Sequence, residues 1–301
     1  MGWLNADEDL QWIIENGVEF FVFEKNRLIS ALAVAKNLAK KAIVHIEVET
    51  GMNRTGFNSI DLKWVQDFLK KHSDFIQFKG LCTHFAGAES IANYFRIKKQ
   101  IDRYDEIYQQ FCAKNLKPQQ RHSACSAAAM MYPETQMDMV RIGIMQYGFW
   151  PSPEVLVNFY NTKRKNENPL KRVISWKSSV MSVKKVKRGE FVGYGTSFMA
   201  DAQMKIACVP VGYAHGYGRS LSNVGRVLIN GERCVVIGSI NMNMMFIDVT
   251  LLDQIKRGDE VVLIGDQAEK QLSVSSFSDY SNLLNYELLI RLSADIPRII
   301  K

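Results

Sequence analysis

The sequence lacks any long uncharged apolar run, and no window approaches the roughly 20 apolar residues that a membrane-spanning helix needs. Residues 1–9 also lack the basic region and the apolar stretch of a secretory signal. Apolar residues make up 47% of the 301 residues and charged residues 23%, which is enough to bury a sizeable core. We therefore expect a cytoplasmic globular protein with two domains that does not enter membranes.

The sequence also lacks closely spaced cysteines: its five cysteines are widely separated and form no CxxC motif. No histidine stands beside them at the spacing of a metal ligand. The sequence likewise contains no Walker loop, no HExxH and no GxGxxG fingerprint. We expect no metal site and no disulfide framework.

Basic residues exceed acidic ones by 38 to 31, but the resulting net charge of +7 is spread along the chain. The one local cluster lacks the interleaved aromatic residues of a protein that binds single-stranded nucleic acid. This cluster comprises Lys163, Arg164, Lys165, Lys171 and Arg172. We interpret it as a solvated loop and expect no nucleic-acid partner.

Residues 5–148 alternate amphipathic helical stretches with short apolar strands, which is typical of a parallel sheet built from βα units. The expected strands are Phe20–Phe23, Ala42–Val48, Phe78–Phe85, His122–Ser126 and Val140–Tyr147. The expected helices include Asn26–Lys40, Leu62–Lys71 and Ser90–Lys114. Because a closed barrel of this kind uses eight strands, five units leave two alternatives: a small open sheet, or a chain that begins partway round a barrel.

After Gly148 the pattern changes, and two prolines mark the boundary that we predict between a first domain, 1–150, and a second, 151–301. Beyond Val173, short alternating segments separated by turns predict an antiparallel β domain. These segments are Val173–Val186, Lys205–Pro210, Arg226–Ile229, Cys234–Ile237, Met245–Val249 and Glu260–Ile264. One more helix is expected at Ser273–Leu284.

Candidate site residues lie at or just beyond the expected strands of the first half, where βα barrels build their sites. Arg54 stands in a glycine-flanked turn, where it is either a carboxylate-binding group or an ordinary surface arginine. His84 closes an apolar strand, a position that more often holds a structural histidine than an acid or base. Ser126 leads into a helix and is followed by Arg141 and Gly143, which suits a phosphate site or a plain helix cap beside a buried arginine.

Two tyrosines of the second half occupy glycine-rich turns. Tyr194 lies in Gly193-Tyr194-Gly195, and Tyr213 begins a glycine-rich run that extends to Arg219. A packed aromatic ring with a solvated hydroxyl is the alternative interpretation of each tyrosine. Neither turn identifies an activity by itself.

Taken in order, these segments resemble the alanine racemase family of pyridoxal phosphate enzymes, from about residue 9 to Arg298. The resemblance implies a (β/α)8 barrel followed by a β domain, so the expected class is α/β, a partial TIM barrel of about five of the eight strands with an antiparallel β domain. It implies an amino-acid racemase that interconverts L- and D-alanine, the latter a cell wall precursor. It also implies a homodimer that shares its active sites across the interface.

The same resemblance assigns roles to residues of this sequence. Arg141 would face the pyridine nitrogen of the cofactor and form a relay with His84, which also lies against the cofactor, to the catalytic Tyr194. Tyr194 would act across the dimer as one of two bases on opposite faces of the cofactor. The remaining residues would hold the cofactor phosphate (Ser126, Gly143 and Ile144), hold the substrate carboxylate (Arg54 and the backbone of Met242) or line the entry corridor (Tyr213 and Arg219).

An arginine at the pyridine nitrogen suits racemisation, because a guanidinium group does not give up its proton. The pyridine then stays largely unprotonated, which limits side reactions of the cofactor. Related decarboxylases of the same barrel class have a carboxylate at this position, so Arg141 disfavours a decarboxylase, the alternative enzyme. A tyrosine with an ordinary pKa near 10 is a poor base at neutral pH unless positive groups favour its phenolate.

Three departures from the family pattern carry expectations of their own. Glu47 stands where most members have a carbamylated lysine, and as a fixed carboxylate it would orient Arg54. Ala294 replaces a tyrosine of the family's last motif, which predicts a wider substrate pocket. No segment matches the family's Lys-Ala-Asn-Ala-Tyr-Gly strand with its Schiff-base lysine, so we expect an N-terminally incomplete chain that is inactive alone; a non-catalytic remnant is the other alternative.

Overall fold

The computed structural model describes residues 7–163, 167–274 and 285–300. Its contacts divide the chain into two compact units, residues 1–146 with 150–169 and residues 147–149 with 170–301. Helix α6 (Pro153–Lys163) belongs to the first unit, because Val155 is buried in a cluster with alanines of α5 (Ser126–Met131). The expected boundary after residue 150 placed α6 in the second domain, whereas the contacts place it in the first unit.

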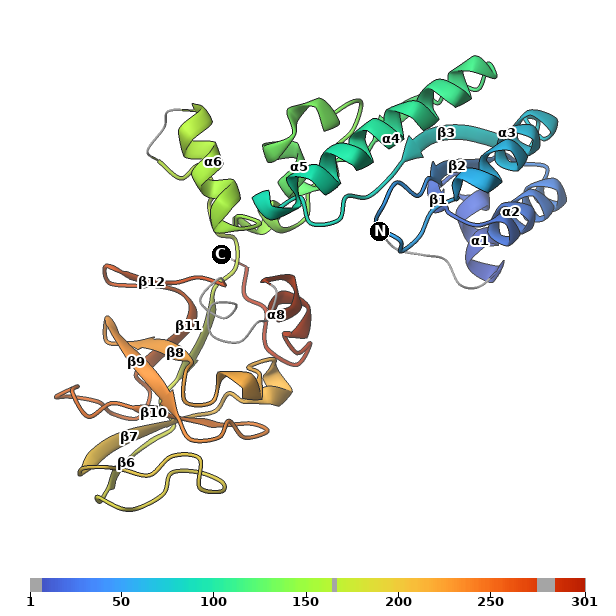
Figure 1. The fold of residues 1–301 in the computed structure, drawn as a ribbon. Helices are drawn as coiled ribbons and strands as arrows, with labels where there is room; N and C mark the ends of the chain where they lie inside the picture. The colour runs from blue at the N-terminus through green and yellow to red at the C-terminus, as the bar shows by residue number, and fades with distance from the viewer. Residues whose placement is uncertain (1–6, 164–166, 275–284, 301) are drawn as a thin grey trace. The chain divides into compact units, whose positions relative to one another are not determined.

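The first unit contains a four-stranded sheet in the order β1-β2-β3-β4, and every neighbouring pair is parallel. Figure 1 labels the first three of these strands. The strands are β1 (Phe20–Val22), β2 (Ala42–Glu47), β3 (Ile76–Cys82) and β4 (Gln120–His122). The helices before and between them are α1 (Asp7–Glu15), α2 (Lys25–Leu38), α3 (Leu62–Lys71) and α4 (Tyr94–Ala113). No helix in the described ranges is long and apolar enough to cross a membrane.

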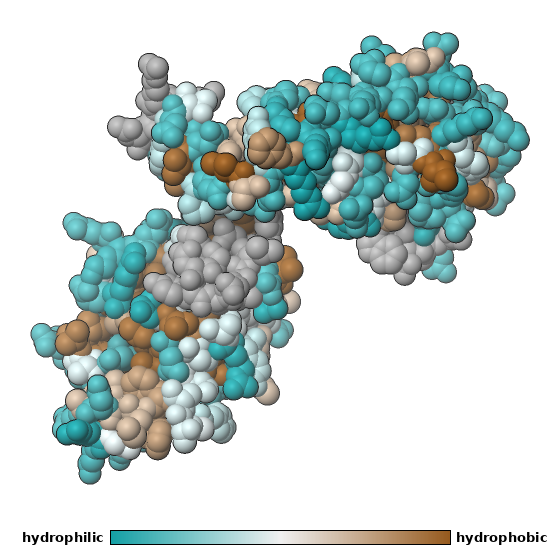
Figure 2. All heavy atoms as spheres, viewed as in Figure 1, coloured by the Kyte–Doolittle hydropathy of each residue, from teal (hydrophilic) through white to brown (hydrophobic). Residues whose placement is uncertain are grey.

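The two faces of this sheet differ in chemistry. Val44 and Ile46 of β2 belong to a buried apolar cluster with side chains of α1 to α4, such as Leu28 of α2. Because side chains alternate along a strand, His45 and Glu47 point to the other face, and both are buried there. The visible outer surface of the helices is mainly hydrophilic (Figure 2). Polar groups are therefore buried on the sheet face that the helices do not cover.

The expected fifth strand, Val140–Tyr147, is not a strand, which corrects the sequence prediction. Arg141 makes a single parallel bridge to Cys125, and Ile144–Tyr147 forms a short 3-10 helix, η4. The N–H of Gly143 donates to the Ser126 hydroxyl at 2.8 Å instead of to a strand carbonyl. The segment therefore leaves the sheet pattern after Arg141.

The second unit contains an antiparallel sheet, as the sequence predicts, and the described residues form eight strands of it. The strands are β5 (Trp176–Ser179), β6 (Ser182–Val186), β7 (Met204–Val209), β8 (Arg226–Ile229), β9 (Glu232–Ile237), β10 (Met245–Asp248), β11 (Glu260–Gln267) and β12 (Lys270–Leu272). Two differences from the expectation are that Val173–Val186 forms two strands and that β12 was not foreseen. Most of the helix expected at Ser273–Leu284 lies outside the described residues, and α8 spans Asn285–Arg291.

Candidate functional site

Hydrogen bonds from both terminal nitrogens hold the Arg141 side chain at the carboxyl ends of β3 and β4. Nη1 donates to the ring Nδ1 of His122 at 2.5 Å and to the carbonyl of the same residue at 3.0 Å. Nη2 donates to the carbonyls of Thr83 at 2.7 Å and Ser123 at 3.0 Å, and lies 3.5 Å from Nδ1 of His84. The guanidinium group therefore has a fixed plane, set by two strands.

The two histidines beside Arg141 are both neutral near pH 7. Burial, followed by the positive charge of Arg141, lowers the pKa of His84 to about 4 and that of His122 to about 3. A neutral imidazole has one nitrogen that accepts a hydrogen bond, and in both rings Nδ1 faces the guanidinium group. Arg141 is therefore the positive centre of this cluster.

The turn after β2 presents Arg54 to solvent. The Glu49 carboxylate accepts from the backbone N–H groups of Gly51 and, at 2.8 Å, of Asn53, and these bonds fix the turn. Burial raises the pKa of Glu47, and the Thr55 hydroxyl donates to its carboxylate at 2.9 Å. Within the described residues no hydrogen bond joins Glu47 to Arg54, so Glu47 holds the turn through Thr55 rather than by direct contact with the arginine.

Ser126, Gly143 and Ile144 come together between α5 and η4. Ser126 is buried as the first residue of α5, with Cys125 as the cap, and its hydroxyl oxygen accepts from the N–H of Gly143 at 2.8 Å. Ile144 is fully buried as the first residue of η4. The serine hydroxyl retains its own hydrogen as a donor, which suits an anion.

Four predicted residues of the second unit lie around one cavity. Tyr194, Tyr213, Arg219 and Met242 line a space of about 380 Å³. Tyr194 is 75% exposed at the tip of its turn, where the flanking glycines have φ values of 77° and 71° that favour glycine. This turn directs the phenol away from its own unit's core.

Backbone hydrogen bonds hold Tyr213 and Met242 next to each other. The N–H of Tyr213 donates to the carbonyl of Asn241 at 3.1 Å, and that of Ala214 donates to the carbonyl of Met242 at 2.9 Å. A Cβ on Gly212 would lie 2.2 Å from the Asn241 oxygen, so only glycine permits this approach. Ala294 is exposed in the turn after α8, and the predicted width of the pocket stays a prediction.

The structure thus groups the predicted residues into two sets, one in each unit, with Arg54 on a turn of the first. The sequence interpretation did not single out His45 and His122, whose rings connect Arg141 to Glu19 across the sheet. The alternation of Val44, His45 and Ile46 was the available signal, because it places a histidine on the face that the helices leave uncovered. No group of three or more potential metal ligands occurs in the described part of the chain.

The low pKa of His122 makes the stability of the fold depend on pH. Below its ordinary pKa of about 6.5 the unfolded chain binds a proton that the folded chain does not, so the free energy of unfolding falls as the pH falls towards 3. We expect His122→Asn, which keeps an acceptor near Arg141, to reduce this slope by up to about 1.4 kcal/mol per pH unit. Urea unfolding at pH 5 and 6 measures it. Above pH 7.5 the free energy of unfolding should change with pH equally in the two proteins. Equal changes below pH 6 would contradict the prediction.

Comparison with known proteins gives the family. The model described as "Alanine racemase, N-terminal domain" matches residues 1–151, and "Alanine racemase, C-terminal domain" matches residues 173–300. The chain belongs to the alanine racemase family. The resemblance inferred from the sequence is therefore confirmed, and so is the fold class of a parallel α/β unit followed by an antiparallel β domain.

Relatives of this family match nearly the whole chain. The alanine racemase of Leptospira interrogans is 33% identical over 305 residues, covering 100% of this chain and 76% of the relative. That of Carboxydothermus hydrogenoformans is 36% identical over 264 residues, covering 88% and 69%. The solved structure of the Streptomyces coelicolor alanine racemase is 26% identical, with a TM-score of 0.89 over 96% of this chain and 74% of the other. The racemase function expected from the sequence is thus supported at the level of the family.

Proposed function

We propose that this chain carries the cofactor-holding and substrate-holding residues of an alanine racemase that uses pyridoxal 5'-phosphate. The observation that carries the proposal is the guanidinium group of Arg141, which several hydrogen bonds hold in place beside His84. Gly143, two residues after Arg141, is hydrogen-bonded to the hydroxyl of Ser126. Arg54 and the cavity around Tyr213 would bind and admit the amino acid. The cytoplasmic location expected from the sequence stays a prediction.

The donors near Arg141 fit the two ends of this cofactor. Within the described residues, Nε of Arg141 has no hydrogen-bond partner, so its N–H can face a pyridine nitrogen while both terminal nitrogens stay bound. The Ser126 hydroxyl supplies a donor for a phosphate in this proposal, and Gly143 and Ile144 would lie beside it. When bound, the cofactor withdraws electrons from the α-carbon of the amino acid and acidifies its proton.

In this proposal the residues of the chain hold and move that proton. Arg54 binds the substrate carboxylate, and the neutral His84 fixes the edge of the Arg141 guanidinium group. The phenol of Tyr194 exchanges a proton with the α-carbon from one face. Because Tyr194 is exposed on its own unit, we propose that it serves the site of a second copy in a homodimer.

The second base of the proposed reaction is a lysine, and the 301 residues contain no match to the family segment that carries it. The test therefore supplies one. The 301-residue chain is joined to the part of the Leptospira interrogans relative that the chain does not match, and pyridoxal phosphate is added. We expect D-alanine to form from L-alanine with exchange of the α-hydrogen, and no such activity from the 301 residues alone.

Tyr194→Phe in the joined protein tests the assigned base. Loss of a positioned proton-transfer group lowers the rate by about 10²- to 10⁴-fold, and we expect that loss while the cofactor remains bound. Tyr94→Phe is the matched control, since Tyr94 is a half-exposed tyrosine of α4, and it should keep full activity. Release of CO2 without racemisation would instead favour a decarboxylase, and equal losses in both variants would remove Tyr194 from the reaction.

A further inference from the structure

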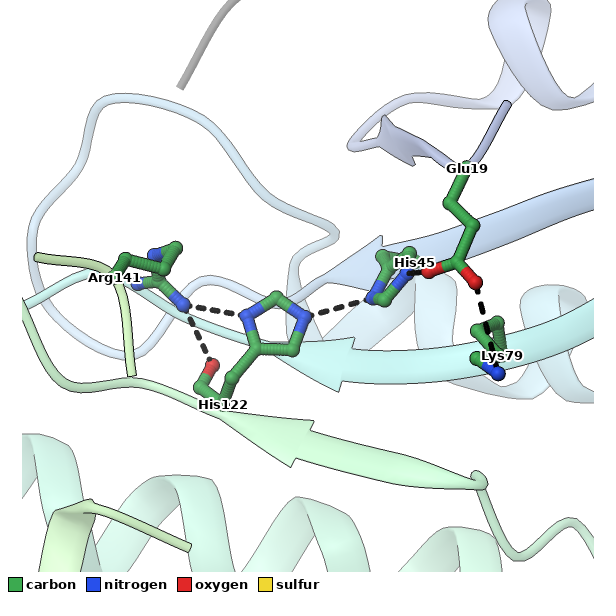
Figure 3. Close-up of polar contacts among 5 residues, drawn as sticks. All are labelled: Glu19, His45, Lys79, His122 and Arg141. Carbon is green, nitrogen blue, oxygen red and sulfur yellow. Dashed lines mark hydrogen bonds and ion pairs between the residues drawn. The ribbon is translucent and has the colours of Figure 1, made fainter. Parts of the chain in front are cut away.

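A row of polar side chains crosses the buried face of the first unit's sheet. Arg141 Nη1 lies 2.5 Å from His122 Nδ1, and His122 Nε2 lies 2.7 Å from His45 Nδ1. His45 Nε2 then lies 2.8 Å from Oε2 of Glu19, whose other oxygen is 3.6 Å from the ammonium group of Lys79. Figure 3 shows the five side chains in sequence, from Arg141 at one end to Glu19 and Lys79 at the other.

The direction of these hydrogen bonds follows from the arginine. A guanidinium group only donates, so His122 Nδ1 must accept, and a neutral His122 therefore carries its hydrogen on Nε2. That hydrogen points at His45 Nδ1, which must in turn accept and leaves the hydrogen of His45 on Nε2. The last hydrogen points at the carboxylate of Glu19. One assignment satisfies all three bonds, with both rings neutral and in the same tautomer.

The charges of the surrounding groups agree with this assignment. The hydrogen bond from His45 lowers the pKa of Glu19, and Lys79 adds to that effect, so the carboxylate is ionised near neutral pH. His45 faces Glu19 and His122 and contacts the ring of Phe21, whereas His122 faces His45 and Arg141. A second hydrogen on His45 Nδ1 would point at the hydrogen of His122 Nε2. The row therefore has an anion at one end, a cation at the other and two neutral rings between them.

We propose that Glu19, His45 and His122 are positioning residues, which hold the Arg141 guanidinium group through two histidine rings locked as neutral Nε2–H tautomers. The carboxylate polarises each ring so that its Nδ1 becomes a better acceptor, as a buried carboxylate does for the histidine of a catalytic triad. A stronger acceptor at His122 Nδ1 strengthens the hydrogen bond from Arg141 Nη1. This bond stabilises the protonated guanidinium group and fixes its orientation. Glu19 thus acts on Arg141 across the width of three strands without touching it.

The consequence for the cofactor rests on the proposed function. If Arg141 faces a pyridine nitrogen, the row from Glu19 sets how firmly the guanidinium group keeps its proton there. The tautomers themselves follow from contacts within the protein. They can be tested without cofactor or substrate.

Long-range 1H–15N correlation spectra of the 301-residue chain decide the tautomers, because the sequence has only five histidines. We expect His45 and His122 to show the pattern of neutral Nε2–H rings at pH 7. In Glu19→Gln the Nε2–H proton of His45 should move upfield, since its bond to a carboxylate becomes a bond to a neutral amide. A smaller shift in the same direction should reach His122. Glu19 is 42% exposed, so this change leaves the core intact.

Glu15→Gln is the matched control, since Glu15 is an exposed glutamate near the end of α1 that does not contact a histidine in the described residues. It should leave both rings unchanged. A ring of His45 or His122 protonated on Nδ1 at pH 7, or on both nitrogens, would overturn the proposal. So would Glu19→Gln that shifts His45 and leaves His122 unmoved, because the row would then end at His45.

A kinetic arm separates this proposal from the proposed function. In the joined protein, Glu19→Gln should lower kcat about tenfold, in the range of changes to groups that orient a functional side chain, and leave KM within about twofold. Glu15→Gln should change neither constant. If the joined protein has no racemase activity, the proposed function fails while the spectra still decide the row. If it is active and both variants match the unmodified protein, the tautomers stand but the positioning role is wrong.

Discussion

Gly80→Ala will separate His45 from His122 and lower the free energy of unfolding by about 2–4 kcal/mol. Gly80 lies on β3, between the strands that carry the two histidines, and the ring of His45 passes directly over it. A Cβ at this position would lie 2.0 Å from Nδ1 of His45, which is far inside van der Waals contact. Overpacking costs about 1–3 kcal/mol, and loss of the buried hydrogen bond about as much again. The gain of up to about 1 kcal/mol from removing a flexible glycine does not offset these terms.

A double-mutant cycle identifies the clash. In a His45→Ala background the methyl group of Gly80→Ala has room, so we expect the second change to be nearly neutral and the coupling to exceed about 1.5 kcal/mol. In a His122→Asn background the ring of His45 is still in place, so Gly80→Ala should remain costly. Urea unfolding of the six proteins provides the measurements. A cost that is equal in all three backgrounds would show that the methyl group meets something other than His45.

Regular elements with a clear apolar period were predictable from the sequence to the residue. Leu62–Lys71 is an α-helix with the expected bounds, because its apolar residues recur at the spacing of one helix face. Arg226–Ile229 is a β-strand with the expected bounds, because a short apolar run lies between turn residues. Val140–Tyr147 has a similar apolar content but is not a strand. The N–H of Gly143 instead donates to the hydroxyl of Ser126, seventeen residues earlier. Local periodicity contains no information on such a partner.

The candidate site shows the same limit. Arg141, His84 and Ser126 could be found because they stand in segments whose order resembles a family. Glu19 could not be found in this way, since it is one glutamate among many and precedes the first strand. It reaches His45 only because the parallel register places Phe21 opposite that histidine. Pairing between strands, rather than composition, brings the ends of the row together.

Arg141→Leu should lower the free energy of unfolding by about 3–5 kcal/mol, because it leaves several buried acceptors without a donor. The guanidinium group provides the donors for the carbonyls of Thr83, His122 and Ser123 and for the ring of His122. Leucine provides none, and each buried acceptor left without a donor costs about 1–3 kcal/mol, less where water enters.

Arg141→Lys tests whether the planar fork matters beyond its charge. An ammonium group is a point donor and cannot reach acceptors on two strands together. We therefore expect the free energy of unfolding of Arg141→Lys to lie between that of the unmodified protein and that of Arg141→Leu. Arg103→Leu is the control, because Arg103 lies on α4 with its bonds to Glu106 and Ser59 at the surface, where such contacts contribute at most about 1 kcal/mol. Denaturant unfolding at pH 8 compares the three variants with His84 and His122 neutral. If Arg141→Leu costs no more than Arg103→Leu, water replaces the guanidinium donors and the two strands do not depend on Arg141 for their junction.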